Sequence, residues 1–102
     1  MMEHKNLDYY TKLAQTGTRE SVETIFKHLN RKMTIAESKF IDYALGLVDT
    51  EIGFNVMVHY LFHGTQIQRN YCTLYFGRRG EYLIIREAFD AGLIDAKQAF
   101  SR

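Results

Sequence analysis

Apolar residues along much of the chain recur three and four positions apart, which is the spacing of one face of an α-helix. Three segments have one such apolar face. A fourth segment, residues 52–62, is apolar on nearly every side, as expected for a helix that its neighbours cover. No proline interrupts any of these segments. The three one-sided faces consist of Leu7, Tyr10, Leu13 and Ala14, of Val22, Ile25, Phe26 and Leu29, and of Phe40, Ile41, Ala44, Leu45 and Val48.

Signals for helix ends punctuate the same pattern. Thr34 and Glu37 have the spacing of a capping box, in which each side chain bonds the backbone N–H of the other residue. Asp95 and Gln98 repeat this spacing near the end of the chain. Gly92 can take the left-handed conformation that ends a helix. The sequence therefore predicts a compact all-α fold, with six or seven short helices in a single domain over residues 1–102.

The stretch NYCTLYFGRRGEYLII, residues 70–85, allows two interpretations. Two β-prone runs around a four-residue turn are typical of a hairpin. A helical pattern, however, continues upstream to Ile67 and downstream to Phe89, and short strands would not require this. We therefore favour a corner between two helices, the first ending at Gly77, with Arg78 and Arg79 at an exposed tip.

Composition narrows the class of protein. The 102 residues include 46% apolar and 25% charged residues with a formal net charge of +1, as in ordinary globular domains. A charge so small implies no global attraction to nucleic acid or membranes. The single cysteine, Cys72, cannot form an internal disulfide, and the first ten residues lack the apolar run of a signal peptide. We expect a cytoplasmic protein with no membrane partner.

A local excess of positive charge stands out in the second half of the chain. Four arginines lie between Gly64 and Arg86, against a single acidic residue, and tyrosines are interleaved with them. Such a patch can follow a nucleic-acid backbone, or it can be a solvated corner that meets another protein. The residues that we predict to bind a partner are Arg69, Tyr75, Arg78, Arg79 and Arg86.

One polar ridge crosses the apolar segment at intervals of four residues: Glu51, Asn55, His59 and His63. Two histidines four apart on a helix can converge on one metal ion. The sequence HYLFH, however, lacks the glutamate of the metalloprotease motif. We expect no metal, and either a hydrated stripe or core histidines satisfied by hydrogen bonds, with His59 and His63 as the outside candidates for metal ligands.

Covalent catalysis finds little support in the sequence. Cys72 lies in an apolar run and is typical of a small buried packing residue. No base is identified for it, and no serine lies in a nucleophile-elbow pattern. We expect no enzyme activity and no cofactor.

Part of the chain is similar to a known family. Residues 8–40 resemble the opening of the Hha/YmoA family, small helical modulators of enterobacterial nucleoid proteins, and the resemblance implies a helical scaffold. The family then carries an Asp-His-Arg cluster for partner binding where this chain reads YALGLVDTEIGF, so no specific partner is implied. The matching residues are Asp8, Tyr9, Leu13, Thr18, Glu23, Thr34 and Glu37.

These observations leave two classes of function. The first is a small helical interaction module, a regulator or inhibitor that offers a surface to another protein. The second is a nucleic-acid-binding regulator that uses the arginine patch. We also expect a homodimer, because the apolar segment 52–62 has more apolar surface than one short chain readily covers.

Overall fold

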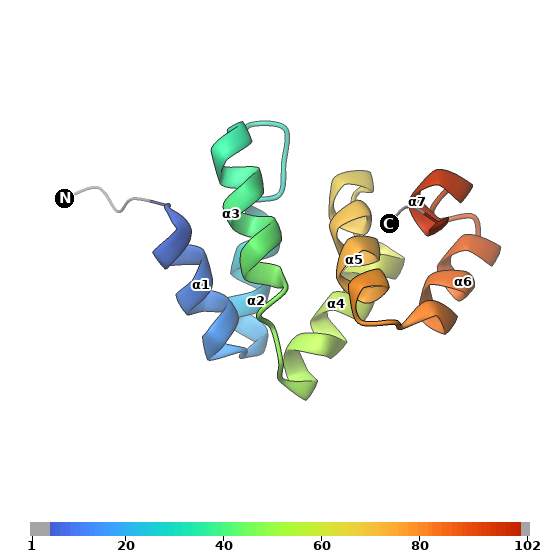
Figure 1. Ribbon diagram of the computed structural model, residues 1–102, viewed down its shortest axis with the longest axis horizontal. Helices are drawn as coiled ribbons and strands as arrows, with labels where there is room; N and C mark the ends of the chain where they lie inside the picture. Colours follow the sequence, from blue (N-terminus) through green and yellow to red (C-terminus); the bar gives the residue numbers. More distant parts are fainter. Residues whose placement is uncertain (1–4, 101–102) are drawn as a thin grey trace. The chain divides into compact units, whose positions relative to one another are not determined.

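The computed structural model describes residues 5–100, and within that range it contains seven helices and no strand (Figure 1). The all-α prediction is confirmed. Residues 1–4, on which the expectation about a signal peptide partly rests, and residues 101–102 lie outside the described range. The helices are α1 (Leu7–Thr16), α2 (Arg19–Lys27), α3 (Ile35–Leu45), α4 (Glu51–His63), α5 (Gln66–Arg78), α6 (Tyr82–Asp90) and α7 (Ala96–Phe100).

The chain divides into two compact units, the first ending at Val56 and the second beginning at Met57. In the first unit α1 packs against both α2 and α3. Its core contains most residues of the predicted faces, but Leu13 and Phe40 are only half-buried and Leu7 is 41% exposed at the start of α1. The prediction of a single domain stays a prediction. The buried apolar side chains of this unit include Tyr10, Ala14, Val22, Ile25, Phe26, Leu29, Ile41, Ala44, Leu45 and Val48.

In the second unit α5, α6 and α7 pack against one another. Cys72 lies fully inside this core, as the sequence predicts. Ile94, in the turn before α7, and Ala99, in α7, complete this core, so even this short helix has a buried side chain. The buried side chains are Met57, Leu61, Cys72, Tyr75, Phe76, Ile85, Ala88, Ile94 and Ala99.

The starts of α3 and α7 follow the predicted caps. Both hydrogen bonds of the capping box join Thr34 and Glu37 at the start of α3. At α7 the N–H of Gln98 donates to Asp95 Oδ1 at 2.8 Å, and the N–H of Asp95 donates to Gln98 Oε1 at 3.0 Å. These bonds satisfy backbone donors that a helix leaves unpaired at its first turn.

The stretch 70–85 is a helix corner, which decides between the two interpretations of the sequence. The predicted end at Gly77 needs correction, because α5 continues to Arg78 and Gly80 takes the left-handed conformation at φ 73°. The N–H of Gly80 donates to Gly77 O at 3.2 Å, and the N–H of Glu81 donates to Phe76 O at 2.9 Å. This pair of bonds closes a helix end only when the residue at position 80 is left-handed. Gly92, at φ 76°, ends α6 as predicted.

We expected no membrane partner, and a helix that spans a membrane must be long and apolar. No helix in the range 5–100 is both long and apolar enough to cross a bilayer.

Candidate functional site

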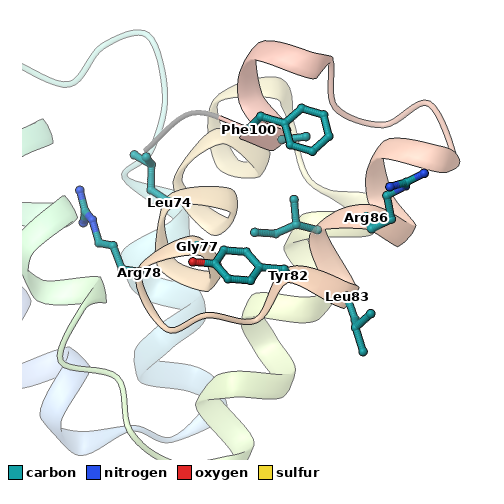
Figure 2. Close-up of a pocket in the computed structure, with 9 residues that line it drawn as sticks. Leu74, Gly77, Arg78, Tyr82, Leu83, Arg86 and Phe100 are labelled. Carbon is teal, nitrogen blue, oxygen red and sulfur yellow. The ribbon is translucent and has the colours of Figure 1, made fainter.

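The second unit has a surface cavity of about 590 Å³ between α5, α6 and α7, which we call the α5–α7 groove (Figure 2). Its size falls within the range of ligand pockets in proteins. Most of its lining is apolar, with one arginine from α5 and one from α6. The residues that line it are Leu74, Gly77, Arg78, Tyr82, Leu83, Ile85, Arg86, Ala99 and Phe100.

A glycine on α5, Gly77, lines the groove beside open space. A Cβ atom placed on Gly77 would meet only Ile85 Cδ1, at 3.9 Å, so the space beside this residue is empty. Ile85 itself is 4% exposed and forms part of the floor. The corner at Gly80 turns α6 back alongside α5, and this brings the two helices together as walls of the same cavity.

The lips of the groove expose large apolar side chains. The exposed fractions are 54% for Tyr82, 84% for Leu83 and 61% for Phe100. Phe100 contacts Phe89 edge-on, with ring centroids 5.5 Å apart. Exposed apolar groups that gather on one surface with a polar rim are typical of an interaction site.

Two arginines bound this apolar surface. Figure 2 shows Arg78 at the α5 side of the groove, with its side chain extending outward away from Tyr82, and Arg86 on the opposite side, along α6. Arg86 Nε donates to Asp90 Oδ1 at 3.1 Å, and both side chains of this pair are more than half exposed. An ion pair in such a position contributes little to stability, and its arginine can exchange partners at small cost.

The other residues of the predicted partner surface lie differently. The Arg79 guanidinium carbon lies over the Tyr75 ring, 4.5 Å from its centroid. Tyr75 is only 3% exposed, so its ring belongs to the core. Arg69 Nη2 donates to Phe62 O at 3.2 Å, and its Nε is buried without a hydrogen-bond partner.

The structure therefore brings two of the five predicted residues, Arg78 and Arg86, to one site. Arg79 is exposed at the neighbouring corner. Arg69 uses its side chain to cap the carboxyl end of α4, where carbonyl groups lack helical partners.

Sequence analysis gave neither Tyr82 nor Leu83 a role in binding. A signal was nevertheless present. Leu83 lies off the helical face that Tyr82, Ile85 and Ala88 define, so a leucine there had no core to enter. Phe100 gave no comparable signal, because its exposure depends on where the short helix α7 docks.

The histidine ridge lies on the surface of α4. The rings of His59 and His63 are 5.0 Å apart between centroids, and both residues are exposed. Within residues 5–100 no group of three histidine, cysteine, aspartate or glutamate side chains gathers to hold a metal ion. Burial raises the pKa of the Cys72 thiol well above its usual range, so this cysteine stays protonated in the core.

A second cluster of titratable groups lies in the first unit. Tyr10 Oη donates to Glu37 Oε2 at 3.0 Å, and Tyr9 Oη lies 3.4 Å from His28 Nε2. Burial lowers the pKa of His28, Lys5 lowers it further, and Glu37 opposes both. The Thr34 N–H and the Tyr10 hydroxyl hold the pKa of Glu37 below its usual value. Because these bonds join α1 to the end of α2 and the start of α3, the cluster stabilises the packing of the first unit.

Comparison with known proteins adds no identity to this geometry. Neither family models, nor curated proteins, nor solved structures give a match to the chain. The resemblance of residues 8–40 to the Hha/YmoA family stays a prediction.

Proposed function

We propose that this protein is a small helical interaction module that regulates or inhibits another protein by binding it through the α5–α7 groove. The observation that carries the proposal is the exposure of Tyr82, Leu83 and Phe100 around one cavity. Leaving three large apolar side chains in water forgoes the free energy that their burial would contribute, about 25 cal/mol per Å². Covering them with a partner recovers it. The reduced cytoplasm is the compartment that we propose, since the chain has a single cysteine.

Nucleic-acid binding is the second candidate, and one specific observation favours it. Arg78 and Arg79 lie next to each other and exposed at the α5–α6 corner. Phosphate groups bind well to paired guanidinium groups. The apolar lips of the groove, however, contribute nothing to a contact with a phosphate backbone, so we place protein binding first.

The proposal is tested by capture of a partner from host extract, followed by reconstitution with the purified partner. The test variant is Leu83→Ser, because a side chain 84% exposed contributes little to folding. Its matched control is Ile35→Ser, which changes a residue 78% exposed on the first unit. We expect Leu83→Ser to weaken binding of the purified partner at least about tenfold, equal to 1.4 kcal/mol. Equal binding by the two variants would show that the partner uses another surface.

Salt dependence separates the two candidates. If nucleic acid is the partner, the logarithm of the affinity falls steeply and linearly with the logarithm of the salt concentration. Replacing Arg78 and Arg79 by alanine would remove about two phosphate contacts and would then make this slope shallower by about two. For a protein partner held by the apolar lips, we expect a shallow slope and a larger effect of Leu83→Ser than of the arginine substitutions.

A further inference from the structure

We infer that the occupant of the α5–α7 groove is an amphipathic α-helix of the partner, with an apolar stripe that acidic residues flank. The inference rests on the proposed function and names the chemistry of the partner at that site. Three features of the groove carry it: the exposure of its lips, the hydrogen bonding of its walls and the placement of its charges.

The exposure of the lips favours a macromolecule over a small ligand. A pocket for a small molecule usually buries 70–90% or more of its ligand. Here Leu83, at 84% exposed, projects from α6 at the edge of the cavity, and Tyr82 and Phe100 are also more than half exposed. A small ligand on the floor would leave these side chains in water. A longer element laid across the lips covers them together with the floor.

The walls of the groove favour a helix over an extended strand. An extended segment binds by adding its backbone hydrogen bonds to the edge of a sheet. The described part of the chain has no strand, and all three walls of the groove are helices. Residues inside a helix already pair their backbone groups with one another. Such walls offer few backbone groups to an extended segment, whereas an α-helix pairs its own backbone groups and presents apolar residues three and four positions apart.

The charges favour acidic flanks on that helix. Arg78 and Arg86 lie on opposite sides of the apolar surface, so a carboxylate at either edge of the stripe would meet a guanidinium group (Figure 2). Asp90 already accepts from Arg86, but this pair is exposed and costs little to rearrange. A helix with lysines in the same places would bring like charges together on both sides.

The experiment uses three synthetic peptides of about 18 residues, long enough for about five helical turns. The first has leucines at helical spacing with glutamates beside the stripe. The second replaces every glutamate by lysine, and the third keeps the composition of the first but scrambles the order. Binding to the full chain is measured by calorimetry, with circular dichroism to follow helix formation.

We expect the glutamate peptide to bind and to gain helicity, and both other peptides to bind at least about tenfold more weakly. Leu83→Ser should weaken the glutamate peptide by a similar factor, while Ile35→Ser should not. A chain carrying Arg78→Glu with Arg86→Glu should reverse the preference and bind the lysine peptide more tightly. Its thermal melt checks that the exchange leaves the fold intact.

If the scrambled peptide binds as tightly as the glutamate peptide, the occupant is not an amphipathic helix. If the lysine peptide binds as tightly, the flanks of the helix are not acidic. Dodecanoate and an oligothymidylate are tested as alternative ligands. If the chain binds dodecanoate and Leu83→Ser abolishes that binding, the occupant of the groove is a small amphiphile. The same result with the oligothymidylate would make the occupant a single nucleic-acid strand. If none of the peptides binds, but Leu83→Ser still weakens binding of the purified partner, this inference is wrong and the proposed function stands. A partner that binds Leu83→Ser as tightly as the unchanged protein would remove the proposed function itself.

Discussion

Gly53 lies inside α4 and has no room beside it for a side chain. A Cβ atom added there would lie 2.5 Å from Val48 Cγ1 and 2.9 Å from Thr50 Oγ1. Val48 is fully buried and β-branched, so it cannot move aside without disturbing the core. Overpacking of this kind typically costs about 1–3 kcal/mol.

We therefore expect Gly53→Ala to lower the free energy of unfolding by up to about 2 kcal/mol, even though alanine is the better helix former by about 1 kcal/mol. Gly77→Ala is the matched control, because it makes the same change in a helix with open space beside it. There we expect a gain of about 0.5–1 kcal/mol. Denaturant unfolding measures both, and a gain in both variants would contradict the packing around Gly53.

Titration of His28 should make the stability of the first unit depend on pH. The pKa of His28 is lower in the folded protein than its ordinary value of 6.5. The folded state therefore binds fewer protons than the unfolded chain between these two values. The free energy of unfolding is greatest above pH 6.5 and falls as the pH drops through the lowered pKa. The groups that face His28 are Tyr9, Tyr10, Glu37 and Lys5.

This dependence is measured by denaturant unfolding at several pH values between 7.5 and 5, bracketing the ordinary value of 6.5. We expect His28→Gln to lower stability at neutral pH, because the contacts of the ring with Tyr9 and Tyr10 are lost, and to flatten the fall toward acid. His59→Gln, on the exposed ridge, should keep the fall that His28 causes. A fall that persists unchanged in His28→Gln would assign it to other groups.

At the scale of the helices, one side chain joins the start of α4 to the end of α1. Thr50 Oγ1 accepts from the Gly53 N–H at 3.0 Å and donates to Gly17 O at 2.6 Å. Gly17 lies 33 residues away in sequence and ends α1 in the left-handed conformation. The same hydroxyl thus caps one helix and anchors another.

We expect Thr50→Val, which keeps the shape but removes both bonds, to cost about 2 kcal/mol of unfolding free energy, roughly one for the cap and one for the tertiary bond. Thr65→Val is the control. Thr65 caps α5 in the same way, through the Gln68 N–H at 3.2 Å, and the cap alone should cost about 1 kcal/mol. Equal losses in the two variants would mean that the bond to Gly17 contributes nothing.

At the scale of the whole molecule, self-association stays a prediction. Neighbouring residues bury Val56, Met57 and Leu61 on α4, but Ile52 on the same helix is 52% exposed. We expect a homodimer at micromolar concentration, measured by light scattering on a sizing column. Ile52→Asp should shift it toward the monomer, whereas Asn55→Asp, which adds the same charge on the exposed ridge, should not. A monomeric unchanged protein would show that the remaining apolar surface of α4 needs no second copy.

The sequence by itself determined the helical class, several helix ends and most of the core. Helical periodicity and capping boxes are local, since they join residues three or four apart, and so they can be recognised without any tertiary contact. For this reason the faces around Val22 and Ile41, the box of Thr34 with Glu37, and the left-handed end at Gly92 were all predicted correctly. The end of α5 was misplaced by one residue, because Gly77 and Gly80 at the corner could each supply it.

Only the tertiary structure decided which of the predicted site residues share a surface. The sequence grouped Arg69 and Tyr75 with Arg78 by charge and spacing, but Arg69 turns to Phe62 O and Tyr75 enters the core. The α5–α7 groove depends on how three helices dock, and the bond between Tyr10 and Glu37 joins residues 27 apart. Such contacts have no local signature, because they depend on which helix faces meet and not on the order of residues within one helix.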